Sequence, residues 1–236
     1  MSPQTPTYTL LNPHTNPTPP PTPPSSFTLK TPPGTDLWRK PPSTNRRNTP
    51  FLYRPVPLAA LRRARVSFSA DWTVLYEQAG LLVVYPERDA EAGAAWTWGE
   101  NSRWIKTGVE FYGGRANVST VAADRWADWS LVPLSPALLG RSASGVHASD
   151  AVTVELEREV AGDGTPGPGL WVFVVGTGGE RLPVREVSWG FEEEGGEERE
   201  VWVGVYVGKP LKGEGEREGE GELTVTFEGL EIDVVG

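Results

Sequence analysis

The stretch Trp104-Ile105-Lys106-Thr107-Gly108-Val109-Glu110-Phe111 alternates residue types with a period of two. Alternate side chains of a strand lie on opposite faces, so its apolar members (Ile105, Val109, Phe111) are expected to face a core. The next residues, Tyr112-Gly113-Gly114-Arg115, are typical of a hairpin turn because glycine adopts the backbone angles that such turns need. Residues 116–122 are then predicted to form the partner strand.

Similar extended signals continue on both sides of this hairpin. They consist of short runs of β-branched, aromatic and alternating residues at 66–70, 78–85, 126–134, 152–158, 170–175, 201–207 and 223–235. No segment shows a sustained period of 3.6 residues, and glycine and proline, 27 and 23 in number, supply frequent turns. The pattern predicts an all-β antiparallel fold, either a sandwich or a barrel.

The composition also predicts where the folded domain lies. Residues 1–26 are rich in proline and threonine and are expected to form a disordered tail. Residues 27–236 are expected to form one β-sandwich domain. Within it, the stretches near 88–101, 192–200 and 212–222 are rich in glycine, alanine or glutamate, and we expect flexible loops there.

The net charge and the absence of cysteine exclude several classes of function. The chain has no cysteine and a formal net charge of −9, which argues against thiolate metal sites and against a nucleic-acid partner. No apolar run reaches the ~18 residues of a membrane helix, so no membrane partner is expected. The start of the chain has neither a basic nor an apolar region, and no signal peptide is expected. These features favour a cytoplasmic location.

Five motifs in a fixed order resemble the regulation of enolase protein 1 family over roughly residues 29–235. They are Asp36-Leu37-Trp38-Arg39-Lys40, Glu77-Gln78-Ala79-Gly80-Leu81-Leu82, the 104–111 stretch, Asp128-Trp129-Ser130 and the 203–210 stretch. Where this chain has Glu77, the family usually has Asp. The resemblance implies a concanavalin A-like jelly-roll sandwich and a cytosolic regulatory protein with enolase as its partner.

The candidate ligand site lies on one face of the predicted sheet. If Ala79, Leu81 and Val83 face the core, Gln78 lies on the same side as Lys106 and Glu110. Sandwiches of the implied fold often bind carbohydrate on a concave sheet face, and an aromatic platform with few polar groups suits a sugar or another small molecule. The candidate residues are Gln78, Trp104, Lys106 and Glu110, with Trp129 and Trp38 as walls. The alternative is an exposed Lys106–Glu110 ion pair beside tryptophans of the core.

Catalytic and metal sites find little support in the sequence. Glu110 has no evident carboxylate partner, although a retaining glycosidase needs two. Glu155 and Glu157 share a face opposite apolar residues and are expected to face solvent. His14 and His147 are the only histidines, so neither a metal site nor a Ser-His-Asp triad at His147 is expected.

The leading hypothesis is therefore a non-enzymatic regulatory or interaction protein without a cofactor. The alternative is a carbohydrate-binding module or a glycan-active enzyme that uses the concave face. An enzyme of another class on the same scaffold also stays open, because one fold can carry many functions.

Overall fold

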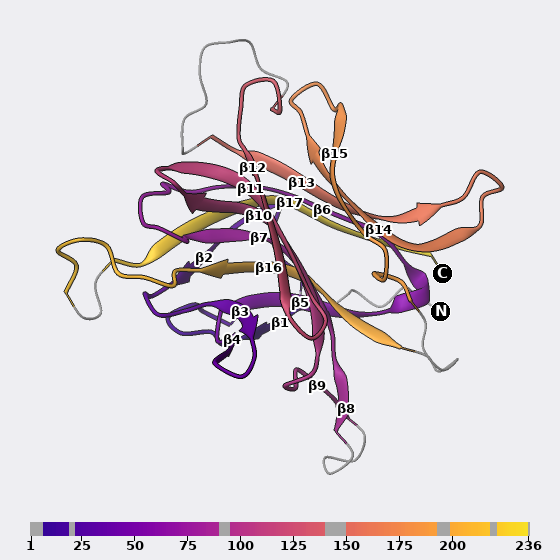
Figure 1. Ribbon diagram of the computed structural model, residues 1–236, viewed down its shortest axis with the longest axis horizontal. Helices are drawn as coiled ribbons and strands as arrows, with labels where there is room; N and C mark the ends of the chain where they lie inside the picture. The colour runs from indigo at the N-terminus through magenta and orange to yellow at the C-terminus, as the bar shows by residue number, and fades with distance from the viewer. Residues whose placement is uncertain are drawn as a thin grey trace.

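The computed structural model describes residues 7–18, 22–89, 95–139, 150–192, 199–217 and 221–235. Within these ranges the protein is built from antiparallel β-strands (Figure 1), with one short 3-10 helix, η1 (Leu58–Ala60), as its helical element. The predicted all-β antiparallel sandwich is confirmed. In the described part of the chain, no helix has the length and apolar character needed to cross a membrane.

One layer of the sandwich is a seven-stranded sheet whose spatial order differs from the chain order. Its strands, in the order in which they lie side by side, are β1 (Thr9–Leu11), β5 (Phe51–Pro57), β16 (Glu200–Gly208), β7 (Gln78–Tyr85), β10 (Arg103–Tyr112), β11 (Arg115–Ala123) and β12 (Ala127–Pro133). The predicted hairpin joins β10 to β11. Gly113 and Gly114 form its turn with φ of 62° and 74°, left-handed values that glycine adopts at little cost.

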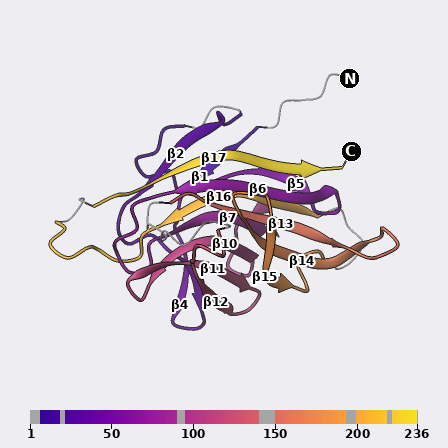
Figure 2. The same cartoon turned by 90° about the horizontal axis from the view of Figure 1, so that it is seen from above.

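The other layer is a six-stranded sheet. Its strands, again in spatial order, are β15 (Arg181–Val187), β14 (Pro166–Val175), β13 (Val152–Val160), β6 (Leu61–Ser69), β17 (Leu223–Val234) and β2 (Ser26–Thr31). Figure 2 shows β17 between β2 and β6, so strands from the two ends of the chain lie side by side.

The main core fills the space between the sheets. Alternate residues of β7 and β10, including Leu81, Val83 and Ile105, pack there against residues such as Phe68 and Val154 of the six-stranded sheet. A second apolar cluster covers the other face of the seven-stranded sheet. Its members are Leu37, Phe51, Tyr53, Leu82, Val84, Trp104, Val121, Ala123, Trp202 and Tyr206. The seven-stranded sheet is thus apolar on both faces, which explains the dense hydrophobic run of β7.

Two segments expected to lack regular structure contain strands. Within residues 1–26, β1 pairs with β5, and the Asn12 side chain donates to the carbonyls of Arg47 and Thr49, both at 3.0 Å. Within residues 88–101, β8 (Glu87–Asp89) pairs with β9 (Ala95–Thr97). A further hairpin, β3 (Leu37–Lys40) with β4 (Thr44–Arg47), covers part of the outer face of the seven-stranded sheet. Parts of the other two predicted loops, 193–198 and 218–220, lie outside the described residues.

Candidate ligand-binding pocket

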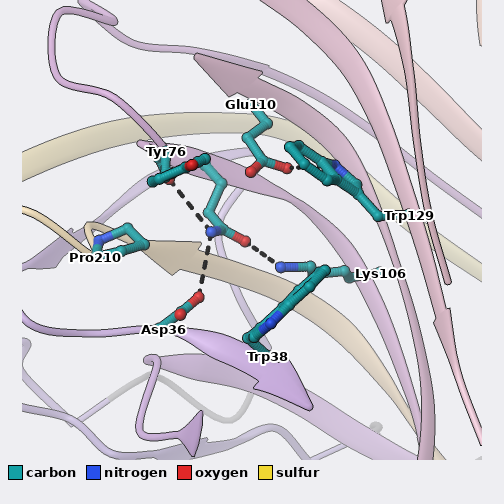
Figure 3. A pocket seen from close by; sticks show the side chains of 8 residues that line it. Asp36, Trp38, Tyr76, Lys106, Glu110, Trp129 and Pro210 are labelled. Atoms are coloured by element: carbon teal, nitrogen blue, oxygen red, sulfur yellow. Dashed lines mark hydrogen bonds between the residues drawn. The ribbon is translucent and has the colours of Figure 1, made fainter. Parts of the chain in front are cut away.

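A pocket of about 250 Å³ opens on the outer face of the seven-stranded sheet. Strands β7 and β10 form its floor, and loops and neighbouring strands supply its walls (Figure 3). It is lined by Asp36, Trp38, Tyr76, Gln78, Lys106, Glu110, Trp129 and Pro210. Five of the six candidate residues from the sequence therefore meet in one cavity.

Strand register explains why the polar residues of the floor converge. In the antiparallel pair of β7 and β10, Glu110 lies opposite Gln78, Gly108 lies opposite Gly80 and Lys106 lies opposite Leu82. Directly opposed residues point to the same face, so Gln78, Lys106 and Glu110 share the outer face.

The two opposed glycines keep the middle of this floor free of side chains. A Cβ atom on Gly108 would lie 1.9 Å from the carbonyl oxygen of Ala79, and one on Gly80 would lie 2.0 Å from that of Thr107. Backbone atoms cannot move aside as the end of a flexible side chain can, so only glycine fits this close approach.

Lys106 is the cation of the floor, and it is only 2% exposed. Its Nζ donates to the carbonyl oxygen of Leu37 at 2.8 Å and to Oε1 of Gln78. Burial lowers the pKa of the Lys106 ammonium, while the carboxylates of Glu110 and Asp36 act in the opposite direction. These two bonds use two of the three N–H donors of the ammonium, and its Nζ also lies 5.8 and 5.9 Å from the ring centroids of Trp104 and Tyr206.

Glu110 is 5% exposed and is held through one of its two oxygens. Oε2 accepts hydrogen bonds from Ser119 Oγ at 2.7 Å and from Trp129 Nε1 at 3.1 Å. No side chain or backbone group of the described residues donates to Oε1, and Figure 3 shows the carboxylate pointing into the pocket. Burial raises the pKa of Glu110, although Lys106 and the two donors oppose this shift.

Asp36 supplies a second carboxylate, which the sequence analysis did not select. It precedes β3 and lies within reach of Gln78, whose Nε2 donates to Asp36 Oδ1 at 3.5 Å. Burial raises the pKa of Asp36, and the cations Lys106 and Arg46 counteract it. The sequence held a signal for Asp36, because the residue opens the motif that also contains Trp38.

Aromatic side chains from separate segments form the walls. The ring of Trp129 on β12 packs edge-on against that of Trp38 on β3, with centroids 6.0 Å apart, and lies 6.4 Å from the ring of Tyr76. Tyr76 has a φ of 69°, a left-handed value that is rare for a bulky residue. Such conformations persist where the surroundings fix them, and they are common at functional sites.

The loop that carries Tyr76 is fixed by a buried ion pair. Glu77 Oε2 accepts hydrogen bonds from the backbone N–H groups of Thr73 and Val74, at 2.8 and 2.9 Å. Its Oε1 lies 3.3 Å from Lys209 Nζ, and both side chains are 3% exposed. Lys209 directly precedes Pro210 of the pocket, so this pair holds two wall segments in place.

Three expectations from the sequence need correction or fall outside the described residues. Trp104 shares the outer face but does not line the pocket, because it is 1% exposed within the second apolar cluster. Glu155 does not face solvent: it is 1% exposed and lies among arginines. His147 lies outside the described residues. Among those that are described, no group of three His, Asp or Glu side chains is placed to hold a metal ion.

The fold and this pocket define a class, an all-β sandwich with a small polar pocket outside its main core. Comparison by sequence then gives the family: residues 16–234 match the family described as "Protein of unknown function (DUF1349)", and the chain belongs to it. An uncharacterized protein of Emericella nidulans is 39% identical over 211 residues, which cover 89% of this chain and 88% of the relative.

Solved structures share the fold. A functionally unknown protein from Saccharomyces cerevisiae matches with a TM-score of 0.61 at 21% identity, with 90% of this chain and 89% of that chain covered. The alginate lyase from Klebsiella pneumoniae matches with a TM-score of 0.51 at 9% identity, covering 89% and 82%. The GH43 protein BlXynB from Bacillus licheniformis gives 0.52 at 13%, covering 89% of this chain and 33% of that one. These three structures thus share the antiparallel β-sandwich fold of this chain.

Proposed function

We propose that the protein binds one small hydroxyl-rich ligand, a sugar residue, in this pocket. The observation that carries the proposal is the convergence of aromatic walls on a polar floor. Trp38 and Trp129 offer apolar ring surface, Lys106 offers an ammonium, and Glu110 offers an acceptor that the protein leaves unused. Ligand sites commonly combine apolar walls with a few fixed polar groups.

The size of the pocket supports a ligand of about one ring. Its volume of about 250 Å³ is below the range of ~300–1,000 Å³ that is usual for drug-sized ligands. The similarity to the alginate lyase concerns the fold alone, so the chemistry of the pocket itself supports the sugar.

A thermal-shift screen against monosaccharides and disaccharides tests this proposal. A sugar present at about 100 times its dissociation constant should stabilise the protein by about 2.7 kcal/mol. Trp38→Ala should weaken binding about tenfold because it removes one wall. Trp126→Ala is the matched control, since Trp126 is 56% exposed and lies outside the pocket. Absence of a shift with every sugar would contradict the proposal.

A glycan-active enzyme is the second candidate, and one observation favours it. Asp36 and Glu110 place two carboxylates in the same pocket, and burial raises the pKa of both. Hydrolysis of glycosides uses two carboxyl groups in one site, one protonated as the acid and the other ionised. Release of new reducing ends from a bound oligosaccharide, abolished by both Asp36→Asn and Glu110→Gln, would favour the enzyme over the binding protein.

A regulatory role toward enolase and a cytoplasmic location remain predictions, supported by the sequence motifs alone. A pull-down with purified enolase, with and without the sugar found in the screen, tests the partner. A fluorescent fusion in cells tests the location.

A further inference from the structure

The charges of the pocket do not balance. Asp36 and Glu110 supply two carboxylates, and Lys106 supplies one ammonium. Arg46 approaches Asp36 from outside, with 3.8 Å between Nη1 and Oδ2, but its side chain is 55% exposed, and water therefore weakens its effect. When all these groups are ionised, the pocket itself has an excess of one negative charge.

The excess charge has a definite location at Glu110. Oε2 is occupied by Ser119 and Trp129, whereas Oε1 has no donor in the described part of the chain. The Nζ of Lys106 donates instead to Leu37 and Gln78 and forms no ion pair with Glu110. A carboxylate oxygen that is accessible from a cavity and has no protein donor favours a ligand that brings one.

The walls favour the same kind of ligand. The face of an aromatic ring attracts a cation, and tryptophan does so best. Trp38 and Tyr76 line the cavity together with Trp129, whose Nε1–H edge is turned to Glu110. A phosphorylated or carboxylated sugar would instead add negative charge beside two carboxylates, in a site where water screens poorly.

On these grounds, and resting on the proposed function, we infer that the pocket selects an amino sugar whose protonated amine donates to Glu110 Oε1. A bare metal ion fits less well, because the Lys106 ammonium already interacts electrostatically with both carboxylates and no metal-binding group of three is present among the described residues. The hydroxyl groups of the ligand would meet the ammonium of Lys106 and the carboxylate of Asp36.

Matched pairs of sugars test the inference by isothermal titration calorimetry at pH 6.5. The pairs are glucosamine with glucose, and galactosamine with galactose, with glucuronate and N-acetylglucosamine as charge controls. In at least one pair the amine should bind tenfold or more tightly than the neutral sugar, and N-acetylation should remove this gain. Glucuronate should bind more weakly than glucose.

The variant Glu110→Gln removes the negative charge of this side chain but keeps its shape, so it shows which of the two produces the preference for the amine. It should reduce the preference for the amine to less than twofold while neutral sugars still bind. Glu228→Gln, at an exposed position on β17, should leave the preference unchanged. Equal binding of amine and neutral sugar to the unmodified protein would overturn the inference and leave the proposed function standing. Failure of every sugar to bind would overturn both.

Discussion

Two buried glutamates on opposite sides of the sandwich show what separates a site from a structural ion cluster. Glu155 on β13 is enclosed by arginines: Arg63 Nη1 lies 3.0 Å from Oε2, and Arg181 Nε lies 2.7 Å from Oε1. Glu110 on β10 has one oxygen satisfied and one facing a cavity. Burial is similar at both positions. Oε1 of Glu155 also lacks a hydrogen bond, but it is enclosed by the protein, whereas Oε1 of Glu110 faces open space and can serve a ligand.

The cluster around Glu155 is a network of ion pairs in which each arginine contacts a carboxylate, including Arg181 with Glu157. Arg63 contacts Glu231 at 2.9 Å and Asp233 at 2.8 Å in addition to Glu155. Arg63 thus connects three carboxylates, and the cluster lies on the outer face of the six-stranded sheet. We interpret these ion pairs as structural links between β13, β6 and β17.

The largest effect is expected from Lys106→Met. Removal of the ammonium leaves Glu110 without the cation that offsets its burial and leaves Asp36 with Arg46 alone, which should cost about 4 kcal/mol in the free energy of unfolding at pH 7. Urea denaturation measures it, with the exposed Lys30→Met as control. A loss below about 1 kcal/mol would mean that the pocket is far better hydrated than its burial indicates.

Glu155→Ala should be nearly as destabilising but should leave the pocket intact. The three arginines that lose their partner are partly exposed, so water compensates in part, and we expect a cost of about 3 kcal/mol. Sugar binding at a temperature where the variant is folded should equal that of the unmodified protein. If binding fell as well, the two regions would be coupled and the comparison would fail.

A smaller effect is expected from Ser119→Ala. The change removes one donor to Glu110 Oε2 and should cost about 1 kcal/mol. It should also raise the pKa of Glu110 further, because the lost hydrogen bond stabilises the charged carboxylate. Titration followed by the fluorescence of Trp129 can measure this pKa; a fall would contradict the hydrogen-bond assignment.

The smallest effect concerns acid pH. The folded-state pKa of Glu110 is raised above its ordinary 4.5, so the native state binds the proton more tightly than the unfolded chain. The contribution of Glu110 to the free energy of unfolding is therefore fully present below pH 4.5 and is lost as pH rises through the raised value. Glu110→Gln should remove this decline, whereas Glu155→Gln should not remove it. Denaturation midpoints across that range provide the measurement.

Much of the pocket floor could be predicted from the sequence, and the walls only in part. Alternation along β10 and β7 placed Gln78, Lys106 and Glu110 on one face, because a strand has a strict period of two. Asp36 and Tyr76 were missed because they come from loops, whose path depends on tertiary contacts such as the Glu77–Lys209 pair. The left-handed backbone of Tyr76 has no sequence signal.

Two errors have a common physical origin. Alternation shows which residues share a face but not what covers that face. Trp104 lies on the pocket side, yet the second apolar cluster covers it, and Glu155 lies on the solvent side, yet arginines from β6 and β15 enclose it. The residues that cover Trp104 and Glu155 come from segments distant in sequence, so a local pattern cannot reveal them.

The spatial order of the strands also determines which strand edges stay unpaired while the chain is being translated. Strand β16 lies between β5 and β7, and β17 lies between β2 and β6. The edges of β5, β7, β2 and β6 therefore stay unpaired until the last part of the chain leaves the ribosome. Between β2 and its partner β17, about 190 residues must be translated, which takes roughly 10–40 s at ordinary elongation rates. During that interval the nascent chain exposes open strand edges, and it depends on chaperones or on rapid completion to avoid aggregation.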